Sequence, residues 1–167
     1  MIFNILSVFK EIIKPSLKYG ILAKAIKKKK IKVNLYSYSD YLKDGDRLDD
    51  KQFGGDPGMV IKYENASRAI KEIRKSNPKT TTIFLSPKGK KLNNNLAVKL
   101  SKIKNLSIIC GRYEGFDQRI IDEYADMEIS IGDYVVSGGE GPAIILVDSI
   151  SRMINGVVGK KDSVAKD

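Results

Sequence analysis

The chain contains no histidine and only one cysteine among its 167 residues. Without histidine there is no Ser-His-Asp triad, no Cys-His pair and no histidine-ligated metal site, so any proton transfer must use Asp, Glu, Lys, Tyr or the substrate itself. A single cysteine, Cys110, excludes an internal disulfide and fits a reducing cytoplasm. Because Cys110 ends the apolar run LSIIC, we interpret it as a buried small hydrophobic residue.

Membrane, export and nucleotide-binding signals are missing as well. No apolar run approaches the ~20 residues of a membrane-spanning helix, so we expect no membrane partner and a cytoplasmic location. The first residues, MIFNILSVFKEIIKPS, lack a basic leader and a small-residue cleavage site, and we interpret them as a buried strand that runs into a helix. The pattern GxxxxGK[ST] does not occur, and GxGxxG does not follow the first predicted strand.

Basic residues exceed acidic ones, 30 Lys+Arg against 20 Asp+Glu, for a formal net charge of +10. Such a balance favours polyanionic partners, above all nucleic acid. Lysine dominates the basic set, however, and lysine-rich composition is also typical of AT-rich genomes. The lysine run at 27–30 closes a predicted helix, where cations interact well with the helix dipole, so it is a weak sign of a phosphate-binding patch.

Short apolar or β-branched runs alternate with segments of helical periodicity, which predicts a single α/β domain. We expect strands at residues 2–8, 31–36, 81–85, 106–110 and 127–131, and helices at 21–28, 66–75, 96–103, 116–124 and 143–154. The alternation predicts a mainly parallel sheet with helices on both faces. Residues 40–59 are polar and rich in glycine, and we expect a long functional or mobile loop there.

The segment from Cys110 to Pro142 holds two glycine-bearing loops, at residues 111–115 and 132–142. Each follows a predicted strand end, and residues 85–89 (LSPKG) supply a third loop at the same edge. Open α/β sheets bind ligands at the carboxyl ends of their strands, where glycine lets the backbone approach a ligand. Glu140 would repel phosphate, which argues against a nucleotide triphosphate. We predict a pocket built from backbone, carboxylates and one arginine, with no metal.

Two pairs of charged residues, one in this segment and one on the last predicted helix, each allow two interpretations. Arg112 and Glu114 form either a surface turn with a weak ion pair or a site in which Glu114 faces a positive ligand group. Asp148 and Arg152 lie four residues apart, as in a helix-surface ion pair, but Arg152 could equally present its planar fork to a base or a phosphate. The residues alone leave these alternatives open.

The chain resembles the bacterial tRNA (guanine-N1)-methyltransferase family, of the SPOUT superfamily, in the segments GGDPGMV, LSPKG, CGRYEGFDQRIIDEYAD, SIGDYVVSGGEGPAIILVDSISRMINGVVG and AKD. The resemblance implies S-adenosylmethionine-dependent methylation of N1 of the guanosine immediately 3′ of the anticodon in tRNA. It also implies a deep trefoil knot near the C-terminal half, whose loops bind the cofactor. A homodimer with the active site between subunits is implied too.

The resemblance also assigns roles to residues. It implies that Arg152 holds the target guanine or its developing charge, and that Asp167 is the general base that takes the N1 proton. This chemistry is sensible, because burial raises the proton affinity of a carboxylate and an arginine stabilises negative charge on O6. Cofactor contacts are implied for Ser86, Pro87, Gly111, Tyr113, Glu114, Gly115, Ile131, Gly132, Tyr134, Val136, Gly138, Gly139 and Pro142.

The chain departs from the family pattern at Asp56, where glycine or alanine is usual, and at Gly141, where a larger apolar residue is usual. The implied organisation is a cofactor-binding domain over residues 1–159 and the start of a linker over 160–167, without the family's C-terminal tRNA-binding helical domain. We therefore expect cofactor binding and dimerisation but poor tRNA methylation. The alternatives are another SPOUT enzyme that methylates ribose 2′-hydroxyls, and a non-catalytic RNA-binding module.

Overall fold

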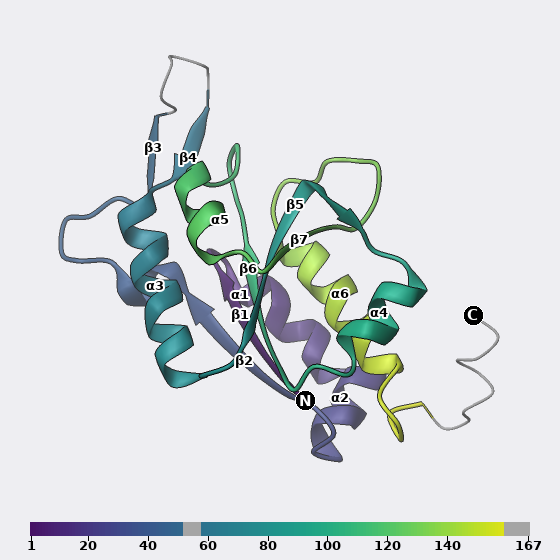
Figure 1. Cartoon of the computed structure of the whole chain (residues 1–167). Coiled ribbons are helices and arrows are strands. Elements are labelled where there is room, and N and C mark those ends of the chain that lie inside the picture. Colours follow the sequence, from purple (N-terminus) through teal and green to yellow (C-terminus); the bar gives the residue numbers. More distant parts are fainter. Residues whose placement is uncertain (52–57, 159–167) are drawn as a thin grey trace.

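Five parallel strands form the central sheet of the computed structural model, which describes residues 1–51 and 58–158 (Figure 1). Their order across the sheet is β2-β1-β6-β5-β7. The strands are β1 (Ile2–Ser7), β2 (Lys32–Ser37), β5 (Thr81–Lys91), β6 (Asn105–Cys110) and β7 (Met127–Ser130). The predicted parallel sheet is confirmed, and most predicted strand ends are off by only one or two residues.

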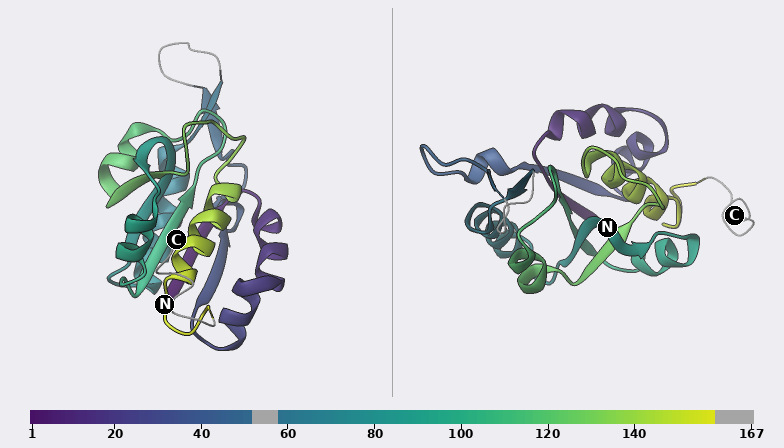
Figure 2. Two further views of the ribbon diagram at one scale, coloured as in Figure 1. Left: turned by 90° about the vertical axis from the view of Figure 1, so that its right-hand side faces the viewer. Right: turned by 90° about the horizontal axis from the view of Figure 1, so that it is seen from above.

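Helices cover both faces of this sheet, as predicted (Figure 2). Alternate strand residues point to opposite faces, so Phe3 and Ile5 join one buried cluster while Leu6 joins the other. The first face carries α1 (Lys10–Ile13), α2 (Gly20–Lys27), α4 (Asn94–Leu100) and α6 (Glu140–Arg152), and the second carries α3 (Tyr63–Ser76) and α5 (Gln118–Tyr124). In the described part of the chain no helix has the length and apolar character needed to cross a membrane.

Strand β5 is longer than predicted. We expected it to end at Leu85 and to turn at residues 86–89, but the strand continues to Lys91. Leu85 and Lys90 both pair with Ile129 of β7, so residues 86–89 form a bulge within the strand. Gly89 allows this close approach, since a Cβ there would lie 2.5 Å from the Ile129 amide nitrogen. The prediction of a strand-to-helix turn at this point is therefore wrong.

The polar segment at residues 40–59 contains regular structure where it is described. A short 3-10 helix (Tyr38–Tyr41) precedes an antiparallel hairpin of β3 (Asp49–Lys51) and β4 (Met59–Ile61). Helix α3 anchors the segment between the 3-10 helix and β3, because Asn65 Nδ2 donates to the Arg47 carbonyl at 2.7 Å. The expectation of a long loop is corrected for these residues, while Asp56 lies outside the described residues.

After β7 the chain returns from the sheet edge toward its centre. Residues 131–139 pass the end of β5 and reach the carboxyl end of β6, where the Gly139 N–H donates to the Gly111 carbonyl at 2.9 Å. Helix α6 then packs against β1 and β6 on the face of the sheet that also carries α1, α2 and α4 (Figure 1). The predicted trefoil knot concerns this return and stays a prediction.

Candidate functional site

A cavity of about 530 Å³ opens at the carboxyl ends of β5, β6 and β7. Its walls come from residues 86–88, 111–116, 128–131 and 135–139, so the two predicted glycine-bearing loops meet the bulge of β5 at one edge of the sheet. Small-molecule sites in proteins have volumes of about 300–1,000 Å³. Within residues 1–51 and 58–158 no three metal-ligating side chains are grouped.

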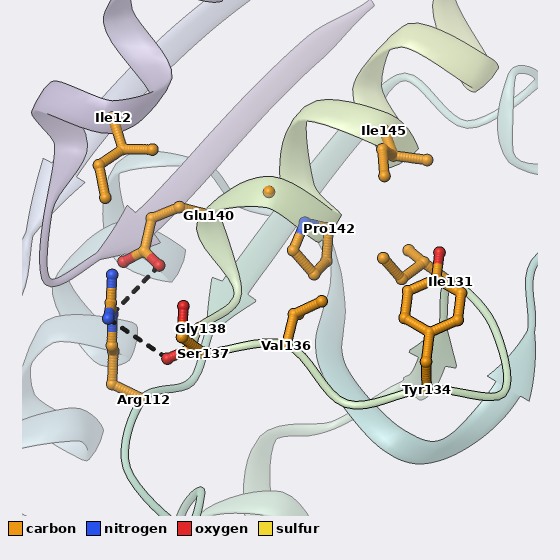
Figure 3. Close-up of a pocket in the computed structure, with 11 residues that line it drawn as sticks. Ile12, Arg112, Ile131, Tyr134, Val136, Ser137, Gly138, Glu140, Pro142 and Ile145 are labelled. Atoms are coloured by element: carbon orange, nitrogen blue, oxygen red, sulfur yellow. Dashed lines mark hydrogen bonds and ion pairs between the residues drawn. The ribbon is translucent and has the colours of Figure 1, made fainter.

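All but two of the predicted cofactor residues line this cavity: Ser86, Pro87, Gly111, Tyr113, Glu114, Gly115, Ile131, Val136, Gly138, Gly139 and Pro142. Tyr134 instead lines a smaller neighbouring cavity of about 230 Å³ (Figure 3). Gly132 packs against the ring of Tyr134, where a Cβ would collide with the ring carbons. The structure brings the loops together, and the cofactor contacts of the individual residues stay predictions.

The loop at residues 111–115 has an unusual backbone. Tyr113, with φ of 60°, adopts the left-handed conformation, which costs a non-glycine residue about 1–2 kcal/mol. The loop is held by β4: the Glu114 N–H donates to the Met59 carbonyl at 2.9 Å, and the Ile61 N–H donates to the Gly115 carbonyl at 3.0 Å. This anchoring leaves the side chains of Tyr113 and Glu114 exposed at the rim of the cavity.

A buried ion pair lies behind the cavity wall. Glu140 begins α6, and its side chain is only 2% exposed. Arg112 Nε lies 3.3 Å from Glu140 Oε2 (Figure 3). The Ser7 hydroxyl donates to Glu140 Oε1 at 2.7 Å. The argument that Glu140 would repel a phosphate in this pocket is corrected, because its carboxylate is turned to Arg112 and Ser7 and does not line the large cavity. The sequence did not predict the Arg112–Glu140 pair, because the two residues meet only when residues 131–139 return to the end of β6.

Cys110 is fully buried at the end of β6, as interpreted from the sequence. Burial raises the pKa of its thiol well above the ordinary value, and the nearby Glu140 carboxylate adds to this effect. Beneath it, the Tyr38 hydroxyl donates to the Cys110 carbonyl at 3.2 Å. Burial likewise raises the pKa of Tyr38 well above its ordinary value. Both groups therefore keep their protons and support the strand end.

Arg152 lies apart from the large cavity. It lines a separate cavity of about 510 Å³ between α4 and α6, together with Asn93, Asn94, Asp148 and Ser149. Arg152 follows Pro142 by ten residues on α6, which corresponds to roughly 15 Å at about 1.5 Å per residue. The structure thus does not bring Arg152 to the cofactor loops of its own chain. Asp167, like the whole segment 160–167, lies outside the described residues.

Known proteins resemble this chain in both sequence and fold. The family model described as tRNA (Guanine-1)-methyltransferase TrmD matches residues 1–167. The tRNA (guanine-N(1)-)-methyltransferase of Francisella philomiragia is 44% identical to this chain, over 100% of this chain and 66% of that protein. The protein of the same name from Borreliella burgdorferi is 50% identical, over 95% of this chain and 66% of that protein.

A solved structure agrees with these relatives. The crystal structure of tRNA (m1G37) methyltransferase from Aquifex aeolicus matches with a TM-score of 0.89 and 39% identity, over 96% of this chain and 72% of that chain. The chain spans 66% of the length of the two curated relatives just named. From the match over its whole length, the chain belongs to the tRNA (guanine-1)-methyltransferase family.

Proposed function

We propose that this chain takes part in the S-adenosylmethionine-dependent methylation of N1 of the guanosine immediately 3′ of the anticodon in tRNA. Membership of the family supports the reaction and the tRNA substrate. The observation that carries the proposal is the meeting of two loops and the β5 bulge around one cavity, beside the carboxyl ends of β6 and β7. Ligands of open α/β sheets bind at this edge.

The lining of the large cavity fits S-adenosylmethionine. Leu85, Val136 and Pro142 offer apolar surface to a purine ring, and the Glu114 carboxylate at the rim suits the positive charge of the methionine part. Gly139 lines the cavity without a side chain and packs directly on β6, where a Cβ would lie 2.6 Å from the Cys110 Cα. Backbone groups at such a wall can hydrogen-bond a base edge. The cofactor, when bound, supplies an electrophilic methyl group.

The position of Arg152 supports an active site shared between two copies of the chain. Ile12, Tyr134, Val136 and Ile145 are 44–56% exposed around the smaller cavity (Figure 3). A grouped apolar surface of this kind is typical of a protein interface. We infer that a second copy covers it and supplies Arg152 to the cavity of the first, because Arg152 is too far from the cavity of its own chain.

Within this shared site the proposed chemistry follows from ordinary acid–base rules. Guanine N1 carries a proton and is a poor nucleophile until the proton leaves, so the reaction needs a general base. The family resemblance assigns that role to Asp167. Arg152 stabilises the negative charge that develops on O6. The proposal includes a cofactor-binding domain over residues 1–159, a linker that begins at 160, the trefoil knot and a cytoplasmic location. The return of residues 131–139 to β6 supports the knot, and the single buried cysteine supports the location.

The proposal is tested on the 167-residue chain by calorimetry with S-adenosylmethionine, light scattering and methyl transfer to a tRNA transcript. We expect saturable cofactor binding, a dimer, and N1-methylguanosine detected by nuclease digestion and mass spectrometry. A transcript with adenosine in place of the target guanosine is the control. Methylated ribose would favour a 2′-hydroxyl enzyme, whereas tight RNA binding without cofactor binding would favour an RNA-binding module.

A further inference from the structure

One buried carboxylate joins segments that are far apart in the sequence. Glu140 Oε1 accepts hydrogen bonds from the Ser7 hydroxyl at 2.7 Å and from the Phe9 N–H at 3.4 Å. Glu140 Oε2 lies 3.3 Å from Arg112 Nε, and Arg112 Nη1 donates to the Ser137 carbonyl at 3.3 Å. The end of β1, the loop at 111–115 and the loop at 131–139 are thereby tied to the first turn of α6.

Arg112 occupies the centre of this network. Its guanidinium carbon lies 4.7 Å from the centroid of the Phe9 ring, and its side chain is 21% exposed. Arg112 Nε and Glu140 Oε2 are buried and do not align as a hydrogen bond with any described group, so charge attraction dominates this contact. A carboxylate as buried as Glu140 requires such a counter-charge. The two side chains therefore depend on each other.

Gly138 of the 131–139 loop lies directly on this ion pair. A Cβ at Gly138 would sit 2.6 Å from both Arg112 Nε and Glu140 Oε2, so no side chain separates the loop from the pair. The next residue, Gly139, donates its N–H to the Gly111 carbonyl at 2.9 Å. Residues 137–139 and 111–112 form adjoining parts of the large cavity wall. The spacing between these two parts is thus set by the pair behind them.

We propose that Arg112 and Glu140 are positioning residues that hold the two loops of the cofactor cavity at the spacing needed for binding. Glu140 does not line that cavity. Arg112 does line it, but its guanidinium is turned to Glu140 and the Ser137 carbonyl (Figure 3). The pair therefore acts through the loops and not on the reacting atoms. The inference rests on the proposed function, since it concerns the site assigned to S-adenosylmethionine.

The test compares Glu140→Gln, Arg112→Lys and Arg112→Ala with the unaltered chain. Glu140→Gln removes the charge and keeps the shape. Arg112→Lys keeps the charge and loses the contact with Ser137. We expect Glu140→Gln and Arg112→Ala each to weaken S-adenosylmethionine binding at least tenfold, and Arg112→Lys to restore part of the loss. The KM for the cofactor should rise while kcat at saturating cofactor changes little, which a general loss of folded protein would not produce.

The double variant Arg112→Ala/Glu140→Gln should bind S-adenosylmethionine about as well as the weaker-binding single variant, because each substitution alone already breaks the ion pair. Arg119→Ala is the matched control, since the exposed Arg119 pairs with Asp117, the residue that caps α5, and should leave binding unchanged. If Glu140→Gln fails to fold, Gly138→Ala gives the second measurement, because it displaces the loop and leaves both charges in place.

The outcomes separate this inference from the function on which it rests. Wild-type affinity in Glu140→Gln and Arg112→Ala, or additive losses in the double variant, would overturn the positioning role alone. An unaltered chain that shows no saturable binding of S-adenosylmethionine would overturn the proposed function and the positioning role together. A reduced kcat at saturating cofactor, with an unchanged KM, would also contradict a role in positioning the cofactor loops.

Discussion

Gly139 is the point at which the return from β7 touches β6, and an alanine there should open the proposed cofactor cavity. A Cβ on residue 139 would lie 2.6 Å from the Cys110 Cα and 3.0 Å from the Gly111 amide nitrogen. Both neighbours are backbone atoms at a buried strand end and cannot rotate away. Because the backbone of Gly139 has φ of −76°, alanine is conformationally allowed, and the effect arises from the collision alone.

The magnitude follows from two contributions. Displacing residue 139 breaks the 2.9 Å hydrogen bond from its N–H to the Gly111 carbonyl, a bond worth about 1 kcal/mol. Overpacking at a tight site costs about 1–3 kcal/mol. If the substitution destabilises the loop conformation that binds the cofactor by the sum, roughly 2–4 kcal/mol, the affinity for S-adenosylmethionine drops by roughly 30- to 1,000-fold. The conversion is about 1.4 kcal/mol per factor of ten.

Gly141→Ala provides the matched control two residues away. A Cβ at Gly141 meets no atom within 4 Å, and the residue lies inside α6. Alanine in a helix is more stable than glycine by about 0.5–1 kcal/mol. Calorimetry should show normal cofactor affinity for Gly141→Ala and a large loss for Gly139→Ala, with similar circular dichroism spectra. Binding by a folded Gly139→Ala variant within threefold of the unaltered chain would refute the reasoning.

Two further predictions concern stability. Gly89→Ala places a Cβ 2.5 Å from the Ile129 amide nitrogen. The overpacking between β5 and β7 should lower the free energy of unfolding, measured by urea titration, by about 1–3 kcal/mol. An unchanged midpoint of the titration would contradict the bulge geometry. Burial raises the pKa of Cys110 above 9.0 and that of Tyr38 above 10.0. Since the folded chain keeps protons that the unfolded chain loses, stability should fall as pH rises above 9.0. Cys110→Ala should reduce the fall in Tm between pH 9 and 10, and an identical pH profile would count against this explanation.

Much of the fold could be predicted because its signals are local. The run LSIIC reads as a buried strand and forms β6, and the apolar residues of α6 recur at helical spacing. Parallel strands end at the same edge of a sheet, so the meeting of the loops at 111–115 and 131–139 also followed from the sequence. For these parts, local propensity and tertiary packing favour the same structure.

The remaining parts depend on contacts between distant residues. Pro87 and Gly89 signal a turn, but pairing with β7 keeps the chain in the sheet as a bulge. The hairpin at β3 and β4 has no clear alternation of apolar residues and depends on α3 for its anchoring. Arg112 and Glu140 belong to separate motifs, and no local pattern indicates that their charges meet in the interior.

Helix α6 begins at Glu140, beside the cavity wall, and ends at Arg152 in a different cavity. If one copy supplies the cavity and the other supplies Arg152, two inactive chains can complement each other. In an equal mixture of Gly139→Ala and Arg152→Ala chains, half of the dimers are mixed. Each mixed dimer then holds one intact site, so about a quarter of the sites regain activity when a two-fold dimer exchanges subunits at random. A site built within one chain would show no such recovery.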